Sequence, residues 1–243
     1  MLRRTRTQIS NAAELAKALR ASEPVRIVLH REDDLSGEAL TAIALAKERS
    51  IDVRPLSQNQ LTRLCQRDIA PELLAMVGPP VHSELADALC GASVVWLLVD
   101  TAYPGNAGFA IRTAEVSGAN GVIICAAFDH EERRAVRRTA MRADRFMPVI
   151  YTEIERAIDA AQEAGLRVVG IEDSGSHAPW EAELRSPTLF VIGGERHGIP
   201  AAVLDRCDDV LRLPMDGFVP SYNLQAAMAM VVGERLRQLA TRD

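Results

Sequence analysis

The feature that most constrains the fold is an alternation of short apolar runs with longer amphipathic segments between residues 93 and 240. Runs of this kind, without polar residues at every second position, predict strands that are buried on both faces. Strands are predicted at 93–100, 121–126, 166–172, 188–193 and 209–215, and helices at 106–120, 131–146, 154–165, 200–207 and 221–240. Such alternation predicts an α/β fold with a mostly parallel sheet and helices on both of its faces.

The residues before this block predict a smaller α/β unit. Helices are expected at 12–20, 36–50 and 57–66, with Ser36 and Ser57 as caps, and strands at 25–30 and 51–56. The segment 75–84 contains Gly78, Pro79 and Pro80, and it is expected to end this block and begin a linker. The predicted organisation is therefore a small domain at 1–80, a linker at 81–92 and a larger domain at 93–243.

Composition excludes several classes of protein. The 243 residues carry a formal net charge of −5, so nucleic-acid binding would have to depend on local basic patches. The longest apolar runs are too short for a membrane span, and the basic N-terminus lacks the apolar segment of a secretory signal. The four cysteines form no C-x-x-C pair, which indicates free thiols in a reducing cytoplasm and neither a zinc nor a redox motif.

A glycine-rich stretch, "GGERHGIP" at 193–200, follows the predicted strand at 188–193. It lacks the lysine of a phosphate-binding loop, the G-x-G-x-x-G of a dinucleotide site and the G-x-S-x-G of a serine hydrolase. Glu195 and His197 are too few ligands for a metal site. A nucleotide-binding α/β enzyme is therefore disfavoured, and no metal is expected.

Polar residues also begin or interrupt two otherwise apolar helices. Asn106, Ser221 and Asn223 stand at helix starts, where capping alone would explain them. Arg112 lies among apolar neighbours and needs a partner. For a lone arginine, a partly buried salt bridge is the simpler explanation.

Three stretches together resemble a known family. They are "PGNAGFAIRTAEVSGANGVII" (104–124), "LFVIGGERHGIPAAVLDRCDDVLRLPM" (189–215) and "SYNLQAAMAM" (221–230). In order and spacing they resemble the three motifs of the SpoU/TrmH-type RNA 2′-O-ribose methyltransferases of the SPOUT superfamily. The resemblance implies a C-terminal deep trefoil knot, S-adenosylmethionine as methyl donor and a homodimer with its sites near the subunit interface. The first block resembles the ribosomal-protein-like RNA-recognition domain that many members carry.

The resemblance also implies roles for individual residues. Arg112 matches the arginine placed at the reacting hydroxyl, and because arginine stays protonated it would stabilise a developing alkoxide or orient RNA phosphate. Asn106 would fix Arg112 or the ribose, and Glu195 would pair with Arg112 or Asn106. Ser221 and Asn223 would line the catalytic pocket. The donor is expected against strand ends on two sides of a pocket: Ile192, Gly193, Gly194, Leu213, Met215 and Leu224.

The helix predicted at 131–146 carries six arginines. RNA phosphate contact is expected at Arg133, Arg137, Arg138 and Arg142, whereas a solvated helix paired with its own acidic residues is the alternative. Arg142 stands where many family members have a glycine, and Tyr222 replaces a commoner leucine.

The predicted function is therefore S-adenosylmethionine-dependent methyl transfer to a ribose 2′-OH, with ribosomal RNA favoured over transfer RNA. Two alternatives keep the same fold: a catalytically inactive RNA-binding module and a base-directed RNA methyltransferase. The joint presence of Asn106, Arg112, Glu195, Ser221 and Asn223 argues against the inactive module and favours ribose over base.

Overall fold

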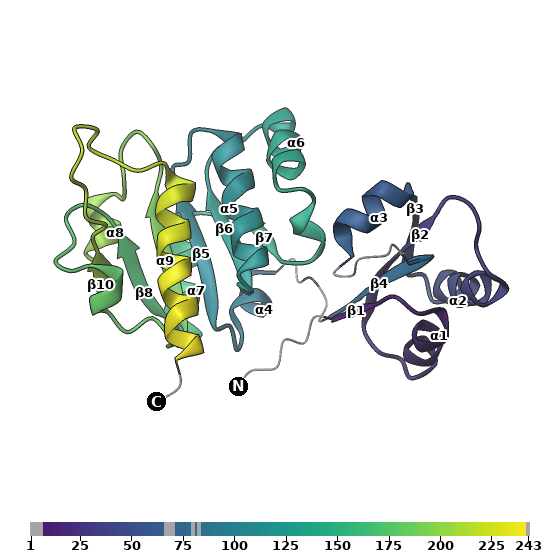
Figure 1. Cartoon of the computed structure of the whole chain (residues 1–243). Coiled ribbons are helices and arrows are strands. Elements are labelled where there is room, and N and C mark those ends of the chain that lie inside the picture. Colours follow the sequence, from purple (N-terminus) through teal and green to yellow (C-terminus); the bar gives the residue numbers. More distant parts are fainter. Residues whose placement is uncertain (1–6, 66–70, 79–80, 82–83, 242–243) are drawn as a thin grey trace. The chain divides into compact units, whose positions relative to one another are not determined.

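The computed structural model describes residues 7–65, 71–78, 81 and 84–241. By its internal contacts the chain divides into two compact units, Met1–Pro80 and Val81–Asp243 (Figure 1).

The first unit is a four-stranded sheet covered by helices. Its elements are β1 (Thr7–Ile9), α1 (Ala12–Arg20), β2 (Val25–Arg31), α2 (Gly37–Glu48), β3 (Asp52–Leu56), α3 (Gln58–Leu64) and β4 (Leu73–Val77). The strand order is β1-β4-β2-β3, in which β2 pairs parallel with β3, while β4 runs antiparallel to both β1 and β2. Helices α1 and α2 pack on this sheet through a core that includes Leu15, Leu19 and Ala42.

The predicted helices of this unit are confirmed, including two of their caps. The Ser36 hydroxyl accepts a hydrogen bond from the Ala39 N–H at 3.2 Å, and Ser57 forms a capping box with Gln60. The expectation that 75–84 begins a linker is wrong for its first residues, which end strand β4. Strand β4 pairs with β1 and β2, which are distant in the sequence, so no local sequence pattern predicted it.

The second unit contains a six-stranded sheet in which every pair of neighbouring strands is parallel, as predicted. The strand order is β10-β8-β9-β5-β6-β7. The strands are β5 (Val94–Val99), β6 (Gly121–Cys125), β7 (Val149–Tyr151), β8 (Arg167–Ile171), β9 (Thr188–Gly193) and β10 (Asp209–Leu211). The helices are α4 (Leu85–Leu89), α5 (Pro104–Val116), α6 (His130–Thr139), α7 (Ile154–Glu163), α8 (Ala201–Leu204) and α9 (Leu224–Ala240).

Helices cover both faces of this sheet. Helices α5, α6 and α9 pack on one face, and α4, α7 and α8 on the other; Figure 1 shows α5 and α9 in front of the strands. Strand β5 explains the arrangement, because Trp96 and Leu98 point into the first core and Leu97 and Val99 into the second. All six of its residues are buried, which is why its sequence shows no polar alternation.

Several elements differ from the predictions. The strand expected at 209–215 ends at Leu211, and the helix expected at 221–240 begins at Leu224. The expected linker at 81–92 contains α4, whose Leu85, Ala88 and Leu89 belong to the core of the second unit. The helix expected at 131–146 ends at Thr139 and is followed by a short 3-10 turn at Ala143–Arg145. The three-residue strand β7 was not predicted, because so short a strand carries almost no periodicity.

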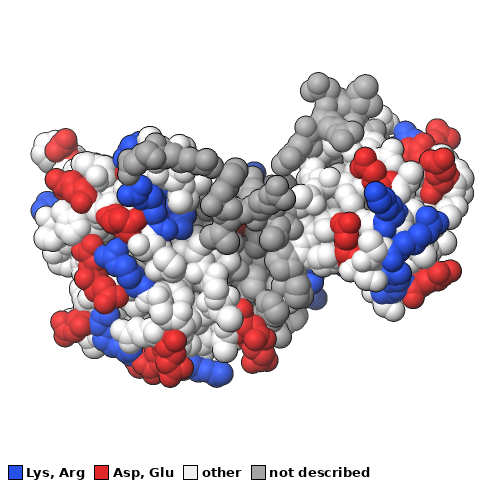
Figure 2. Space-filling view, turned by 90° about the horizontal axis from the view of Figure 1, so that it is seen from below, with Lys and Arg blue, Asp and Glu red and all other residues white. Residues whose placement is uncertain are grey.

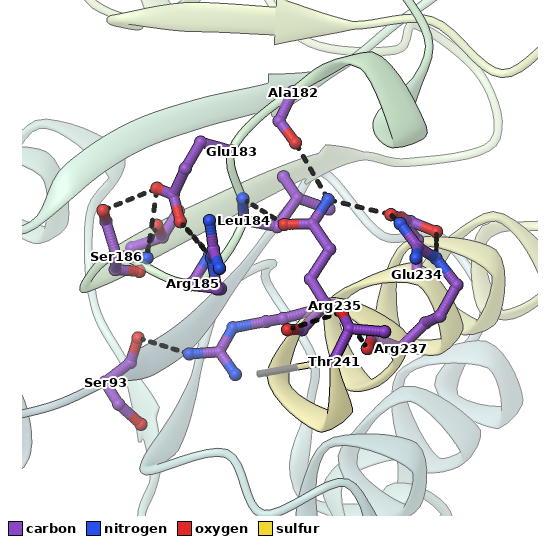
Figure 3. A network of polar contacts seen from close by, with 12 residues as sticks. Ser93, Ala182, Glu183, Leu184, Arg185, Ser186, Glu234, Arg235, Arg237 and Thr241 are labelled. Carbon is purple, nitrogen blue, oxygen red and sulfur yellow. Dashed lines mark hydrogen bonds and ion pairs between the residues drawn. The ribbon is translucent and has the colours of Figure 1, made fainter. Parts of the chain in front are cut away.

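The C-terminal half of α9 is fixed to the segment that leads into β9 (Figure 3). The Gln238 side chain donates to the Ala182 carbonyl oxygen and accepts from the Leu184 N–H, both at 2.9 Å. Arg235, which is only 9% exposed, donates to the Ser93 carbonyl oxygen at 3.3 Å, and burial lowers its pKa. These bonds hold α9 against the sheet.

Surface charge is mixed in sign. On the face shown in Figure 2, acidic and basic side chains alternate around the edge of the second unit, with no large area of one sign. A net charge of −5 agrees with this mixture, so any nucleic-acid surface has to be sought in individual elements.

Candidate active site

A pocket of about 320 Å³ lies where β8 and β9 end. Because β8 and β9 are parallel neighbours, their carboxyl ends meet at one edge of the sheet, where open α/β folds bind ligands. The segment between β10 and α9 forms the opposite wall. The pocket is lined by all six residues expected at the donor: Ile192, Gly193, Gly194, Leu213, Met215 and Leu224.

The glycines at 193 and 194 are required by the packing of the chain on itself. A Cβ on Gly194 would overlap the Asp100 carbonyl oxygen, and one on Gly193 would overlap the Gly198 carbonyl carbon. Both glycines have ordinary φ values, so neither is needed for a left-handed turn. Close backbone packing therefore requires glycine at both positions, and both also line the pocket.

Beside the pocket, three side chains from the three motifs form a hydrogen-bonded chain. The Asn106 amide at the start of α5 donates to the Glu195 carboxylate, and the Asn223 amide donates to the Asn106 side-chain oxygen at 3.1 Å. The second Glu195 oxygen accepts from the Ala102 N–H at 3.0 Å. Of the two partners predicted for Glu195, the structure selects Asn106.

Ser221 and Asn223 are among the residues that line the pocket. Asn223 also caps α9, because its side-chain oxygen accepts from the Gln225 N–H at 2.9 Å. The Asn223 side-chain oxygen thus caps α9, while its NH₂ group bonds to Asn106 in the site. At Asn106, the expected capping is not seen: the cap position of α5 belongs to Tyr103.

Arg112 lies on α5 and is exposed. Among the described residues it has no hydrogen-bond or ion-pair partner, so the partly buried salt bridge is not found. An exposed and unpartnered guanidinium is free to meet a group from outside the chain.

Three further side chains of this region make contacts that the sequence did not predict. Glu172 follows β8 directly and accepts a hydrogen bond from the Ile199 N–H at 2.7 Å. Tyr222 donates from its hydroxyl to the Pro214 carbonyl oxygen at 3.0 Å, which closes the segment before α9 on itself. His197, for which no role was predicted, contacts the Asp100 carboxylate at 3.0 Å. The position of Glu172 after a parallel strand was the one available signal.

The arginines predicted to contact RNA differ in their exposure. Arg133 is engaged within the unit, since its guanidinium lies 4.2 Å from the centre of the Tyr151 ring and donates to the Phe128 carbonyl oxygen. Arg137, Arg138 and Arg142 are exposed. Arg142 has a φ of 61°, a left-handed conformation that favours glycine, which fits the glycine of many family members at this place.

The pocket suits the adenosine part of S-adenosylmethionine. Its volume is within the range of small-molecule sites, its apolar walls come from Ile192, Leu213 and Leu224, and Glu172 and Asp173 are among its polar lining residues. Within the described residues, no group of three or more His, Cys, Asp or Glu side chains is arranged to hold a metal ion. No helix in the described part of the chain has the length and apolarity needed to cross a bilayer.

Known structures share this fold. An AdoMet-bound rRNA methyltransferase from Sinorhizobium meliloti superposes with a TM-score of 0.61 at 21% identity, covering 98% of this chain and 89% of that one. The SpoU methyltransferase AviRb from Streptomyces viridochromogenes, in complex with AdoMet, gives a TM-score of 0.58 at 24% identity, covering 98% and 92%. The chain thus has the fold of these methyltransferases.

Sequence comparison supplies the family. Residues 93–233 match the model of the SpoU rRNA Methylase family. A 23S rRNA (guanosine-2′-O-)-methyltransferase RlmB of Pseudomonas syringae pv. tomato is 28% identical over 210 residues, which are 83% of each chain, and one of Photobacterium profundum is 27% identical over 91% of this chain and 94% of the relative. The chain belongs to the SpoU rRNA methylase family of S-adenosylmethionine-dependent RNA methyltransferases.

Proposed function

We propose that this protein transfers the methyl group of S-adenosylmethionine to a ribose 2′-OH of ribosomal RNA. The observation that carries the proposal is the chain of hydrogen bonds from Asn223 through Asn106 to Glu195 beside the donor pocket. A hydroxyl is a poor nucleophile while it keeps its proton, so the site has to orient it and assist removal of that proton.

The residues of the site divide this work. The donor, when bound, supplies an electrophilic methyl group. Gly193, Gly194 and Leu224 hold its adenosine part, and the Glu195–Asn106 pair fixes the polar edge at which the ribose is received. Ser221 offers a hydroxyl in the same wall. Arg112 stabilises the developing alkoxide or the neighbouring phosphate through the positive charge and the N–H donors of its guanidinium.

A homodimer is part of the proposal. Arg112 shares an exposed face of α5 with Phe109 and Val116, which are 48% and 67% exposed, and Met230 on the adjacent α9 is 44% exposed. Exposed apolar side chains at this spacing along one helix are typical of an interface between subunits. Burying them against a second copy would set Arg112 at the subunit boundary.

The proposed fold detail is a deep trefoil knot. The segments after β8, β9 and β10 pass very close to one another: a Cβ on Gly175 would lie 2.6 Å from the Leu211 carbonyl carbon, and one on Gly198 would lie 2.5 Å from the Glu172 carboxylate. Interleaved segments of this kind are what a knotted C-terminal half requires.

RNA would be held by two elements. In the second unit, the exposed Arg137, Arg138 and Arg142 offer cations to phosphate. Arg133 instead packs on the Tyr151 ring within the unit. The first unit is proposed as the RNA-recognition domain. Ribosomal RNA is favoured over transfer RNA because the RlmB relatives that cover most of this chain are named for 23S rRNA. We propose the cytoplasm as the location of this protein, in agreement with a ribosomal RNA substrate.

The test is direct. Purified protein is incubated with isotopically labelled S-adenosylmethionine and either ribosomal RNA or transfer RNA, and the product nucleosides are identified by mass spectrometry. A 2′-O-methylated nucleoside from ribosomal RNA is expected. A methylated base would favour the base-directed alternative, and RNA binding without transfer would favour the inactive module. Absence of donor binding in calorimetry would overturn the proposal.

A further inference from the structure

Glu172 stands at a junction of three strand ends. It follows β8 directly, and the last residue of β8, Ile171, pairs with Ile192 near the end of β9. Its own N–H donates to the Leu211 carbonyl oxygen at the end of β10, at 3.0 Å. The side chain therefore starts from a fixed point at the carboxyl edge of the sheet.

From that point the carboxylate reaches the glycine-rich loop. One oxygen accepts from the Ile199 N–H at 2.7 Å, and the other accepts from the Asp173 N–H at 3.1 Å. A Cβ on Gly198 would lie 2.5 Å from the Glu172 carboxylate, so the glycine makes room for this contact. Gly198 also has a φ of 63°, which turns the chain so that the next N–H faces Glu172.

The same loop carries the polar group of the site. Gly193, Gly194, Glu195 and Gly198 line the donor pocket, and Glu195 bonds to Asn106 and to the Ala102 N–H. On the β5 side, the loop is held through Glu195 and through the contact of His197 with Asp100. On the β8 side, the bond to the Glu172 carboxylate fixes its downstream end. Removing that bond would release the loop at the point where it leaves the pocket.

We propose that Glu172 is a positioning residue for methyl transfer: its carboxylate holds the loop at 193–199, and with it the donor-binding wall and Glu195. Glu172 is also among the pocket-lining residues, but the bond to the Ile199 N–H is the one by which its carboxylate holds the loop. The inference rests on the proposed function, since it assigns the pocket to S-adenosylmethionine.

Three variants separate this role from general stability. Glu172→Ala removes the acceptor. Glu172→Gln keeps a side-chain oxygen that can accept from Ile199. The matched control is Asp208→Ala, because Asp208 accepts from the Val168 N–H at the same 2.7 Å but at the opposite end of β8, away from the pocket. All three are made in the full chain, and S-adenosylmethionine binding is measured by calorimetry.

Loss of a hydrogen bond to a charged acceptor predicts that Glu172→Ala weakens donor binding by about tenfold or more. Its affinity for ribosomal RNA without donor is expected to stay within about twofold of the wild type, since RNA does not depend on the loop contact. Glu172→Gln should keep donor affinity within about threefold, and Asp208→Ala should keep it unchanged even where its melting temperature falls. Hydrogen exchange at the Ile199 amide should accelerate in Glu172→Ala and much less in Glu172→Gln.

Each outcome bears on a different claim. If the wild-type chain does not bind S-adenosylmethionine, the proposed function and this inference both fail. If the wild type binds it and Glu172→Ala binds it equally well, the proposed function stands and the role of Glu172 is overturned. That role is also overturned if Asp208→Ala weakens donor binding as much as Glu172→Ala. Where Glu172→Ala does not fold, a tenfold loss in the folded Glu172→Gln variant would show that hydrogen-bond acceptance is not the cause.

Discussion

The Asn223 side-chain amide donates to the Asn106 side-chain oxygen at 3.1 Å, across 117 positions of sequence. Because the Asn106 oxygen accepts this bond, its NH₂ group is directed to Glu195. The three motifs are thus joined in a fixed order of donors and acceptors. Any change that reverses one amide breaks the whole chain of bonds.

Replacing Asn106 with aspartate tests this order. Asn106→Asp places a second carboxylate beside Glu195, and the repulsion between the two carboxylates should displace Glu195. The bond from Asn223 keeps its acceptor, because aspartate also offers a side-chain oxygen. We expect the rate of methyl transfer to fall by about 100-fold, measured in single-turnover assays. Asn11→Asp is the control, because Asn11 caps α1 in the first unit and aspartate caps equally well. Full activity in Asn106→Asp would show that the amide has no orienting role.

Arg112→Ala separates chemistry from stability. The side chain is exposed and has no partner among the described residues, so its removal should change the free energy of unfolding by less than about 0.5 kcal/mol. Methyl transfer should fall by at least about 100-fold, while the Kd for S-adenosylmethionine stays unchanged. Arg156→Ala on α7 serves as the control for loss of an exposed arginine. Retained transfer would remove Arg112 from the reaction.

Gly194→Ala tests the close packing of the glycine-rich loop. The added Cβ would overlap the Asp100 carbonyl oxygen, and this backbone atom cannot move aside as a flexible side chain could. We expect the free energy of unfolding to fall by roughly 2 kcal/mol or more, measured by denaturant titration, together with loss of donor binding. Gly37→Ala, where a Cβ meets nothing within 4 Å, should be nearly neutral. Equal stability of the two variants would contradict the packing argument.

Arg142 should contribute to RNA binding despite the strain of its backbone. Arg142→Asn removes the charge and places a residue that tolerates the left-handed conformation at this φ of 61°. Stability should be unchanged or slightly higher, while the slope of log K against log salt for RNA binding should decrease by about 1. Arg142→Lys keeps the charge and should keep the slope. An unchanged slope in Arg142→Asn would show that Arg142 does not contact RNA phosphate.

The anchor of α9 should weaken in acid. Hydrogen bonds from Arg237, then from Gln238, lower the pKa of Glu234 to about 2. Because this pKa is depressed in the folded state, its stabilising contribution is complete above the ordinary carboxyl pKa of about 4.3 and is lost as the pH falls toward 2. The difference in melting temperature between the wild type and Glu234→Gln should therefore shrink between about pH 5 and pH 2. A difference independent of pH would show that the charge of Glu234 is not involved.

The sequence by itself determined the layered architecture of the second unit. Strands such as β5, buried on both faces, have to be wholly apolar. In both units, helices capped by Ser36, Ser57 or Asn223 carry their start signals locally. The resemblance named Ile192, Leu213 and Leu224 by their place in the motifs, and in the structure all three line one pocket.

Only the tertiary structure decided the contacts between distant segments. Strand β4 exists because β1 and β2 pair with it. Helix α4 lies in the segment that the sequence predicted as a linker, yet its apolar residues pack in the core of the second unit. The partner of Glu195, the reason for Gly194 and the reach of Glu172 to Ile199 depend in the same way on chain segments that meet only after folding. Local propensity describes neighbours in sequence, whereas these features are set by neighbours in space.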